Sequence, residues 1–306
     1  MNKCPICKQE EIRVIRKYRG NSNMFANRII SHCLKCDFVF ASPMPTEKEL
    51  EQYNSQYFLN AHGGNATHPI ALAFHSAINK IRAVHALEYA QKKNKSVNRV
   101  LEIGPGLGYL MDYFLNSNPN IEYSIVESDK ENLENLKKKA TSYYTNVNDI
   151  PNGYFDLIVL SHVLEHTIDP NAFLAELFEK VSKKGLIFIE VPNEDYKFKD
   201  LDEPHLLFFN ILSMKNLLEH LNIFDYDITL HGPPISGNFL QKFYRKLYQF
   251  LDHKLFKIKI LIPLYLFYPK MRTYLSDREI ISILPFDAVT KKQNASWWLR
   301  AVAQKK

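Results

Sequence analysis

The chain has 306 residues, of which 46% are hydrophobic, 13% aromatic and 24% charged, a composition that excludes collagen-like, low-complexity and intrinsically disordered proteins. Its length exceeds the usual size of one domain, so we expect one large domain with appendages or two domains. The formal net charge is +6, and eight of the 39 Lys and Arg residues lie in residues 237–272 beside a single acid, Asp252, so the excess positive charge belongs to that segment.

The first residues carry no apolar segment of the kind found in a secretory signal, because Met1 is followed by Asn2, Lys3 and Cys4. We therefore expect a cytoplasmic protein. The most apolar stretch, residues 260–269, is much shorter than the roughly 20 residues that a helix needs to cross a bilayer, so we expect no membrane span.

All four cysteines lie near the N-terminus as two C-x2-C pairs, Cys4 with Cys7 and Cys33 with Cys36. Two such turns supply the four thiolates that Zn2+ prefers in tetrahedral sites. The alternatives are two disulfides, which a reducing cytosol disfavours, or four unrelated buried thiols. A closed four-thiolate site has no open coordination position, so we expect a structural zinc ribbon over residues 1–45 that folds apart from the main core.

Residues 46–95 are expected to form a helical connector or lid. Thr46 and Glu49 have the spacing of a capping box, which predicts the start of a helix. Residues 52–79 contain no charged side chain, which suits a lid over a partly dry pocket, although an ordinary loop remains an alternative. Apolar residues recur at helical spacing over residues 76–95, which predicts an amphipathic helix.

From residue 99 onward, short apolar strands alternate with helical segments. This alternation predicts an α/β fold, with a parallel sheet covered on both faces and ligand sites at the carboxyl ends of the strands. The expected strands cover residues 100–103, 123–126, 155–160 and 186–191, and the expected helices begin near residues 108, 129 and 171.

A glycine-rich loop, with Gly104, Gly106 and Gly108, joins the first of these strands to its helix and follows Glu102. Glycines there allow positive φ angles and let the backbone approach a ligand closely. A dinucleotide fingerprint would place its third glycine at position 109, which is Tyr109, so the loop points away from NAD.

This E-x-G-x-G-x-G loop resembles motif I of the class I S-adenosylmethionine (SAM) dependent methyltransferases. The resemblance implies a Rossmann-like sheet whose last strand is antiparallel, with SAM as the cofactor. It implies that the loop wraps the methionine part of SAM and that Glu102 helps to fix its ammonium end. It also implies that Glu127 holds the ribose hydroxyls and that Asn146 and Val147 meet the adenine.

The sequence over residues 154–166 is similar to the fourth-strand motif of the same family. The resemblance places Ser161 and His162 beside the ligand at the strand exit. Glu165 and His166 recur in these enzymes as a pair on the following turn. In this fold the last two strands, here expected at residues 228–230 and 297–303, form an antiparallel pair. The core then covers residues 96–236, an insertion covers 237–292, and the last strand lies within 293–306.

The segment after the fifth strand falls where relatives that modify sugars or small metabolites carry a histidine facing the acceptor. His205 is therefore our candidate base, and a histidine that only pins the loop is the alternative. Glu203, His166 and Tyr57 are the other groups that we consider for taking the proton.

The chain resembles a group of zinc-ribbon methyltransferases associated with deoxysugars and surface polysaccharides. The resemblance rests on the ribbon, on residues 38–46 and on Tyr53 and Tyr57 after them. The sugar C-methyltransferases of that group carry Tyr-His-Glu-His, where this chain has Asp-Glu-Pro-His at residues 202–205. We therefore expect O-methylation ahead of C-methylation.

The insertion contains apolar residues at helical spacing with interleaved Lys and Arg over residues 239–251. Such a basic amphipathic helix can bind a membrane surface or an anionic substrate, or it can be buried against the core or a partner subunit through residues 237–272.

The sequence thus predicts a SAM-dependent methyltransferase that acts on a hydroxyl of a sugar or sugar nucleotide in surface glycan or natural-product biosynthesis. One alternative is a methyltransferase for a lipid-linked or quinone-like acceptor at a membrane surface. Another is a zinc-ribbon nucleic-acid-binding module, but residues 1–36 lack a dense aromatic and basic surface, so no nucleic acid is expected.

Overall fold

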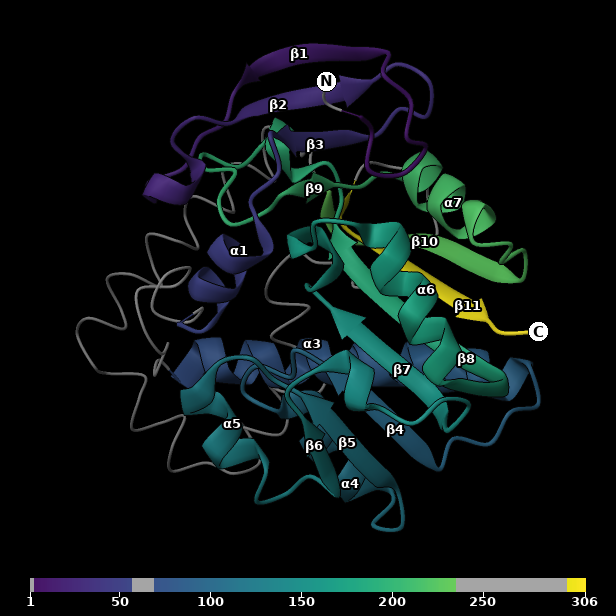
Figure 1. Ribbon diagram of the computed structural model, residues 1–306. Helices are drawn as coiled ribbons and strands as arrows, with labels where there is room; N and C mark the ends of the chain where they lie inside the picture. The colour runs from purple at the N-terminus through teal and green to yellow at the C-terminus, as the bar shows by residue number, and fades with distance from the viewer. Residues whose placement is uncertain (1–2, 57–68, 235–295) are drawn as a thin grey trace.

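A computed structural model of the chain describes residues 3–56, 69–234 and 296–306, and Figure 1 shows their arrangement. Tyr57 and the expected insertion at residues 237–292 lie outside the described residues. Within these described residues the fold has two sheets, one with seven strands and one with four. No helix in the described ranges is both long and apolar enough to cross a membrane.

The seven-stranded sheet has the order β10-β11-β8-β7-β4-β5-β6, and its five strands from β4 to β8 run parallel. The bounds are β4 (Arg99–Ile103), β5 (Glu122–Val126), β6 (Ser142–Tyr144), β7 (Phe155–Ser161), β8 (Val181–Pro192), β10 (Tyr226–Pro234) and β11 (Ser296–Gln304). β11 pairs antiparallel with both β8 and β10. The predicted α/β class and the antiparallel last pair are therefore confirmed.

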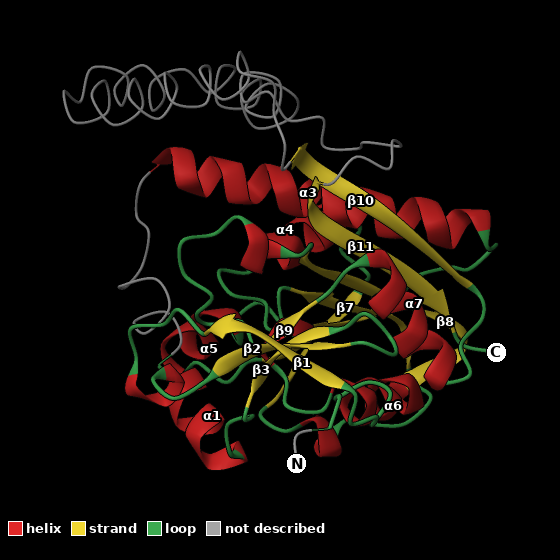
Figure 2. Ribbon diagram, turned by 90° about the horizontal axis from the view of Figure 1, so that it is seen from above, coloured by secondary structure: helices red, strands yellow, loops and turns green. Residues whose placement is uncertain are grey.

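Helices cover both faces of this sheet (Figure 2). They are α3 (Pro69–Lys92), α4 (Tyr109–Ser117), α5 (Lys130–Leu136), α6 (Pro170–Lys180) and α7 (Ile211–His220). Val100 joins the apolar cluster formed with α3 and α4, whereas Leu101 and Ile103 join the cluster formed with α6 and α7. Because successive side chains of a strand point to opposite faces, this alternation holds the register of β4.

β4 lies at the centre of the parallel strands, with β5 on one side and β7 on the other. The strand order reverses at this position. In open α/β sheets, ligands bind in the crevice outside the carboxyl ends of the strands at such a switch point. The glycine loop follows β4 directly, so the topology places it at that crevice.

The N-terminal segment forms the small sheet, in the order β1-β2-β3-β9. Its elements are β1 (Ile12–Lys17), a 3-10 turn η1 (Asn23–Phe25), β2 (Ile29–Cys33), β3 (Val39–Ser42) and β9 (Leu207–Phe208). Helix α1 (Glu47–Asn54) follows β3. Its capping box is as predicted, since Thr46 N donates to Glu49 Oε2 at 2.8 Å and Glu49 N donates to Thr46 Oγ1 at 3.2 Å.

The expectation that the ribbon folds apart from the main core is wrong. β9 belongs to the chain after the large sheet's β8, yet it pairs with β3 of the ribbon (Figure 1). The rings of Phe38 and Phe209 lie 5.1 Å apart, and both residues belong to the cluster that contains Ile103. A sheet of three short strands is too small to bury its own apolar face, so it packs onto the larger core.

Candidate cofactor and acceptor site

The three glycines after β4 all have positive φ angles, +65° at Gly104, +55° at Gly106 and +77° at Gly108. A Cβ at Gly108 would lie 2.5 Å from Leu136, and one at Gly104 would lie 2.9 Å from Val163. A Cβ at Gly106 would meet no atom within 4 Å. The positive φ angles favour glycine at all three positions. At the outer two a side chain would also crowd Leu136 or Val163, whereas Gly106 faces open space.

Glu127 follows β5 and lies against this loop. Its side chain is buried, and Oε1 accepts a hydrogen bond from the backbone N of Asp129 at 2.8 Å. Burial raises the pKa of Glu127 to about 7, with the charge of Asp129 acting in the same direction and the amides of Asp129, Ser128 and Gly106 opposing both. A buried carboxylate beside the glycine loop suits a ligand whose hydroxyls donate to it.

Glu102 lies inside β4 and is also buried, and its Oε2 accepts a hydrogen bond from Tyr123 at 2.7 Å. Burial raises the pKa of Glu102 to about 7, against the opposing effects of the Tyr123 hydroxyl and the charge of Arg82. The structure thus gives Glu102 an internal partner on β5. Its expected role at the ammonium end of a ligand stays a prediction.

Asn146 and Val147 lie just after β6, at the same edge of the sheet. The Asn146 side chain caps the 3-10 turn η2 (Val147–Asp149) by accepting from the backbone N of Asn148 at 2.9 Å. Asn146 is exposed and Val147 is half-buried. Their assignment to an adenine ring stays a prediction.

Ser161 and His162 leave β7 on the other side of the loop. The Ser161 hydroxyl is buried and has no hydrogen-bond partner among the described residues. His162 has a φ of 57°, and its ring lies between two carboxylates, with Nδ1 3.1 Å from Glu165 and Nε2 3.3 Å from Glu190. Burial would lower the pKa of His162, but the two carboxylates more than offset it and the pKa is raised.

Glu190 is a buried neighbour of His162 that the sequence analysis missed. It is fully buried in β8, where Arg82 Nε of α3 donates to Oε1 at 2.7 Å and Arg300 of β11 donates to Oε2. An acid within the apolar strand 186–191 is a signal that could have found it, because buried charges are nearly always paired. Glu190 therefore links β8 to α3 and β11 through the two arginines, and it also contacts His162.

His205, His166 and Glu165 come together in the structure. Glu165 and His166 lie in the 3-10 turn η3 (Leu164–His166), and the His166 and His205 rings are 5.0 Å apart. His205 Nδ1 lies 2.6 Å from Oδ2 of Asp195, which belongs to the 3-10 turn η4 (Asp195–Lys197). Burial lowers the pKa of His166 to about 4. The sequence offered no signal for Asp195.

Glu203 has a different set of contacts from those of His205. Its Oε2 accepts from the backbone N of Asn21 at 2.6 Å and of Ser22 at 3.0 Å, and Oε1 accepts from the Tyr53 hydroxyl at 3.1 Å. These bonds anchor the loop after β1 and helix α1 to the loop that carries His205.

The neighbouring Asp202 makes a similar connection to the ribbon. Its carboxylate accepts from Arg16 at 2.7 Å and from Arg19 at 2.9 Å, and Asp202 is 1% exposed. The Tyr18 hydroxyl donates to the backbone O of His205 at 2.8 Å. The N-terminal hairpin therefore holds the His205 loop in place through both charged and neutral hydrogen bonds.

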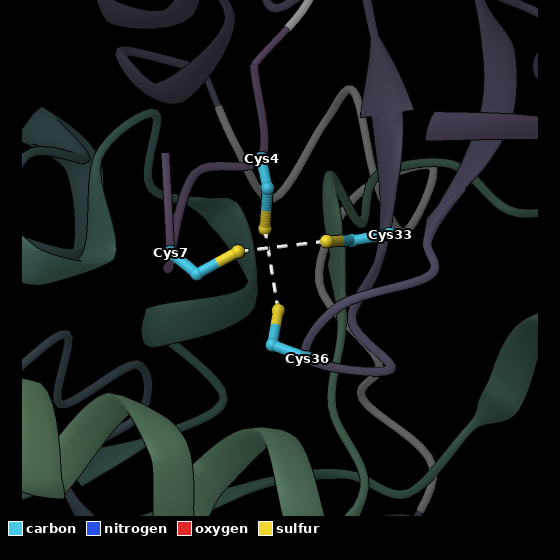
Figure 3. Close-up of side chains that lie close together, drawn as sticks. All are labelled: Cys4, Cys7, Cys33 and Cys36. Carbon is cyan, nitrogen blue, oxygen red and sulfur yellow. Dashed lines mark hydrogen bonds between the residues drawn. The ribbon is translucent and has the colours of Figure 1, made fainter. Parts of the chain in front are cut away.

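The four cysteines converge in the ribbon (Figure 3). The Sγ atoms of Cys4 and Cys36 are 3.5 Å apart, as are those of Cys7 and Cys33, and all four are free. Disulfide sulfurs lie about 2.05 Å apart, so the disulfide alternative is wrong. Convergence of all four within 4.8 Å also rules out unrelated thiols, and a tetrahedral zinc with bonds of about 2.3 Å is compatible with these separations.

Comparisons with known proteins identify a family and several similar structures. A family model described as a methyltransferase domain matches residues 75–227. Among solved structures, a SAM-dependent methyltransferase from Archaeoglobus fulgidus is 18% identical over 74% of this chain and 94% of its own, with a TM-score of 0.44. Another from Thermotoga maritima is 14% identical over 75% and 92%, with a TM-score of 0.45.

The plantazolicin methyltransferase BamL, solved with S-adenosylhomocysteine and a triazolic desmethyl analogue, is 15% identical over 85% of this chain and 98% of its own, with a TM-score of 0.47. Among curated proteins, none matches the sequence.

Proposed function

Because the chain belongs to the methyltransferase domain family, whose model matches residues 75–227, we propose that this methyltransferase moves the methyl group of SAM to a hydroxyl of a sugar or sugar nucleotide. The resemblance of residues 1–235 to zinc-ribbon enzymes of deoxysugar and surface-polysaccharide chemistry supports this acceptor class. Surface glycan or natural-product biosynthesis is the context that we propose for it.

The observation that carries the proposal is the position of Glu127 against the glycine loop. A buried carboxylate whose charged form is stabilised by the Gly106 amide can accept hydrogen bonds from both ribose hydroxyls. The loop from Gly104 to Gly108 would hold the methionine portion, with Glu102 toward its ammonium end. Asn146 and Val147 would lie beside the adenine, and Ser161 and His162 beside the reacting end.

When bound, SAM supplies a methyl group activated by its sulfonium charge. The residues of this chain then need to align the acceptor with that methyl group, exclude water and activate the acceptor oxygen. His205 is buried and held by Asp195, so we assign it to the acceptor and not to the cofactor. Its Nε2 is the nitrogen available for that task, because Nδ1 is used in the contact with Asp195.

We also propose a structural zinc ion at Cys4, Cys7, Cys33 and Cys36. The convergence of four free thiols supports it, and the closed ligand set leaves no position for a substrate. The ion would stabilise the hairpin that holds the His205 loop.

The test is a screen of sugar nucleotides with the purified chain and SAM, read by mass spectrometry as the gain of one methyl group in place of hydrogen. The Glu127→Ala variant serves as the control, because it should lose the product together with SAM binding. Methylation of no sugar or sugar nucleotide by a chain that binds SAM would overturn the proposed acceptor class.

A lipid-linked or quinone-like acceptor is the second candidate, and the eight basic residues in 237–272 favour it. Co-sedimentation with anionic vesicles separates the two candidates, since a sugar-nucleotide enzyme needs no membrane. The same segment could instead mediate self-association, which a measurement of molar mass in solution would show.

A further inference from the structure

Three side chains on the acceptor side form a cluster with the composition of a metal site. Glu165, His166 and His205 each offer one ligand atom, and these atoms lie within 4.8 Å of one another. Glu165 is fully buried, and His205 is 6% exposed. The two chain segments are joined by a backbone hydrogen bond of 2.9 Å from Leu206 N to Glu165 O, so the cluster is built on a fixed frame.

Two carboxylate oxygens, one in the cluster and one on Asp195 beside it, lack hydrogen-bond partners among the described residues. Oε2 of Glu165 and Oδ1 of Asp195 are both buried and have no hydrogen-bond partner within the described parts of the chain. A buried carboxylate oxygen without a donor is costly, and a bound cation is one of the few groups that would offset that cost.

Both histidines are oriented as metal-binding histidines usually are. Nδ1 of His166 lies 3.2 Å from the backbone O of Pro204, and Nδ1 of His205 lies 2.6 Å from the carboxylate of Asp195. A carbonyl or carboxylate oxygen can only accept, so each Nδ1 carries a proton and donates it. In its neutral form, each imidazole then has its lone pair on Nε2, the nitrogen that would bind a metal ion.

The cluster also borders the cofactor loop. Glu165 Oε1 lies 3.1 Å from Nδ1 of His162 at the exit of β7. Val163, which follows His162 in the chain, packs against Gly104. A Cβ atom added at Gly104 would lie 2.9 Å from the Val163 side chain. A group bound to the cluster would therefore lie next to the methyl donor.

We propose that Glu165, His166 and His205 bind a divalent transition-metal cation that holds the acceptor oxygen. Two imidazoles and one carboxylate suit Zn2+, Mn2+, Fe2+ or Co2+ and leave coordination positions open, unlike the closed cysteine site. This inference rests on the proposed function and specifies how His205 acts on the acceptor, as a ligand to the cation and not as the base.

The step balances without any redox partner. The bound cation would lower the pKa of the acceptor hydroxyl, so that its proton would be lost to solvent as the acceptor binds, before methyl transfer. The oxygen lone pair forms the new C–O bond as the S–C bond breaks, and the electron pair of that bond stays on sulfur.

Mn2+ is the probe that separates this site from the cysteines, because thiolate sites select softer metals. The full chain is treated with EDTA, reloaded with Zn2+ to one equivalent, and titrated with Mn2+ while the electron paramagnetic resonance signal of free Mn2+ is followed. We expect one Mn2+ per chain in the parent, and at least tenfold weaker binding in Glu165→Gln and in His166→Gln.

The matched control is Glu176→Gln on α6, which removes another carboxylate with a buried oxygen that has no hydrogen-bond partner among the described residues. In the same part of the chain, Glu176 belongs to no group of three possible metal ligands. This variant should bind Mn2+ like the parent. Adenosine binding by each variant checks that its fold is intact. Absence of Mn2+ binding in the parent, or unchanged binding in both cluster variants, would overturn the proposal whatever the acceptor is.

Once an acceptor is found, turnover is compared with and without Mn2+ in the zinc-loaded chain. Dependence on Mn2+ in the parent supports the proposed step. Full turnover of the metal-free parent, combined with loss of turnover in His205→Ala, would overturn it and assign His205 as the base. The proposed function would survive that result.

Discussion

Nδ1 of His205 donates a hydrogen bond to Oδ2 of Asp195 across 2.6 Å, and neither residue is more than 6% exposed. Asp195 precedes His205 by ten residues and lies in a different turn, so the pair fixes the ring within a loop that could otherwise move. The orientation of Nε2, and with it the action of His205 on an acceptor, depends on this contact.

We predict that His205→Ala keeps the affinity for SAM and loses turnover. The loss should be at least about 100-fold, because the activation of the acceptor oxygen is worth several kcal/mol. Asp195→Asn should lose about 10- to 100-fold through misorientation of His205. Calorimetry for SAM and single-turnover rates measure the two effects separately. If His205→Ala also abolishes SAM binding or unfolds the protein, the role of His205 is to hold the loop in place and not to act on the acceptor.

We predict that Glu127→Ala loses most of its measurable affinity for SAM. Two charge-assisted hydrogen bonds to the ribose would be lost, each worth about 1.5–3 kcal/mol. Isothermal titration calorimetry with SAM measures the change, and Ser128→Ala, an exposed neighbour, is the control. A Glu127→Ala variant that binds SAM as tightly as the parent would show that the ribose lies elsewhere.

The affinity for adenosine should rise with pH through about 7 and level off above it. Burial raises the pKa of Glu127 to about 7, and ribose hydroxyls donate stronger hydrogen bonds to the ionised carboxylate than to its protonated form, so binding weakens below that pH. The affinity should fall by at most tenfold per pH unit on the acidic side, because one proton is involved. Adenosine is the ligand of choice because it lacks the methionine portion of SAM, whose α-amino group would titrate as well.

Glu127→Gln is the control for this pH dependence. Glu102 also has a pKa of about 7 and remains in that variant. If the affinity of Glu127→Gln keeps the pH dependence of the parent, Glu102 and not Glu127 is the responsible group.

Cys33→Ser should release zinc and reduce turnover more than it reduces adenosine affinity. The ribbon holds the His205 loop through Arg16, Arg19 and Tyr18, whereas the glycine loop belongs to β4 and α4. Metal analysis, adenosine calorimetry and turnover give the three readouts. A freshly reduced parent without zinc would contradict the metal assignment. Equal losses of turnover and of adenosine affinity would show that the ribbon supports the whole core.

Glu190→Ala should destabilise the fold by about 3–5 kcal/mol, because it removes the carboxylate that pairs with the buried charges of Arg82 and Arg300. Urea unfolding followed by circular dichroism measures the change. Glu179→Ala on the exposed face of α6 is the control and should stay within about 0.5 kcal/mol of the parent. A similar small effect at Glu190 would mean that water reaches the two arginines.

The sequence by itself determined the alternation of strands and helices, the glycine loop and the two cysteine pairs. Each of these depends on residues close together in the chain. The capping box at Thr46 and the loop after β4 follow from local backbone requirements, which any correct fold must satisfy. The sequence analysis gave no range for β6, because this three-residue strand at the edge of the sheet has little apolar signal.

The tertiary structure alone decided which distant residues meet. The pairing of β3 with β9, the partnership of Asp195 with His205 and the contacts of Arg82 and Arg300 with Glu190 all join separate segments. Such contacts depend on how the apolar faces pack and on the need to pair every buried charge. These are properties of the whole folded chain, and no local pattern of residues contains them.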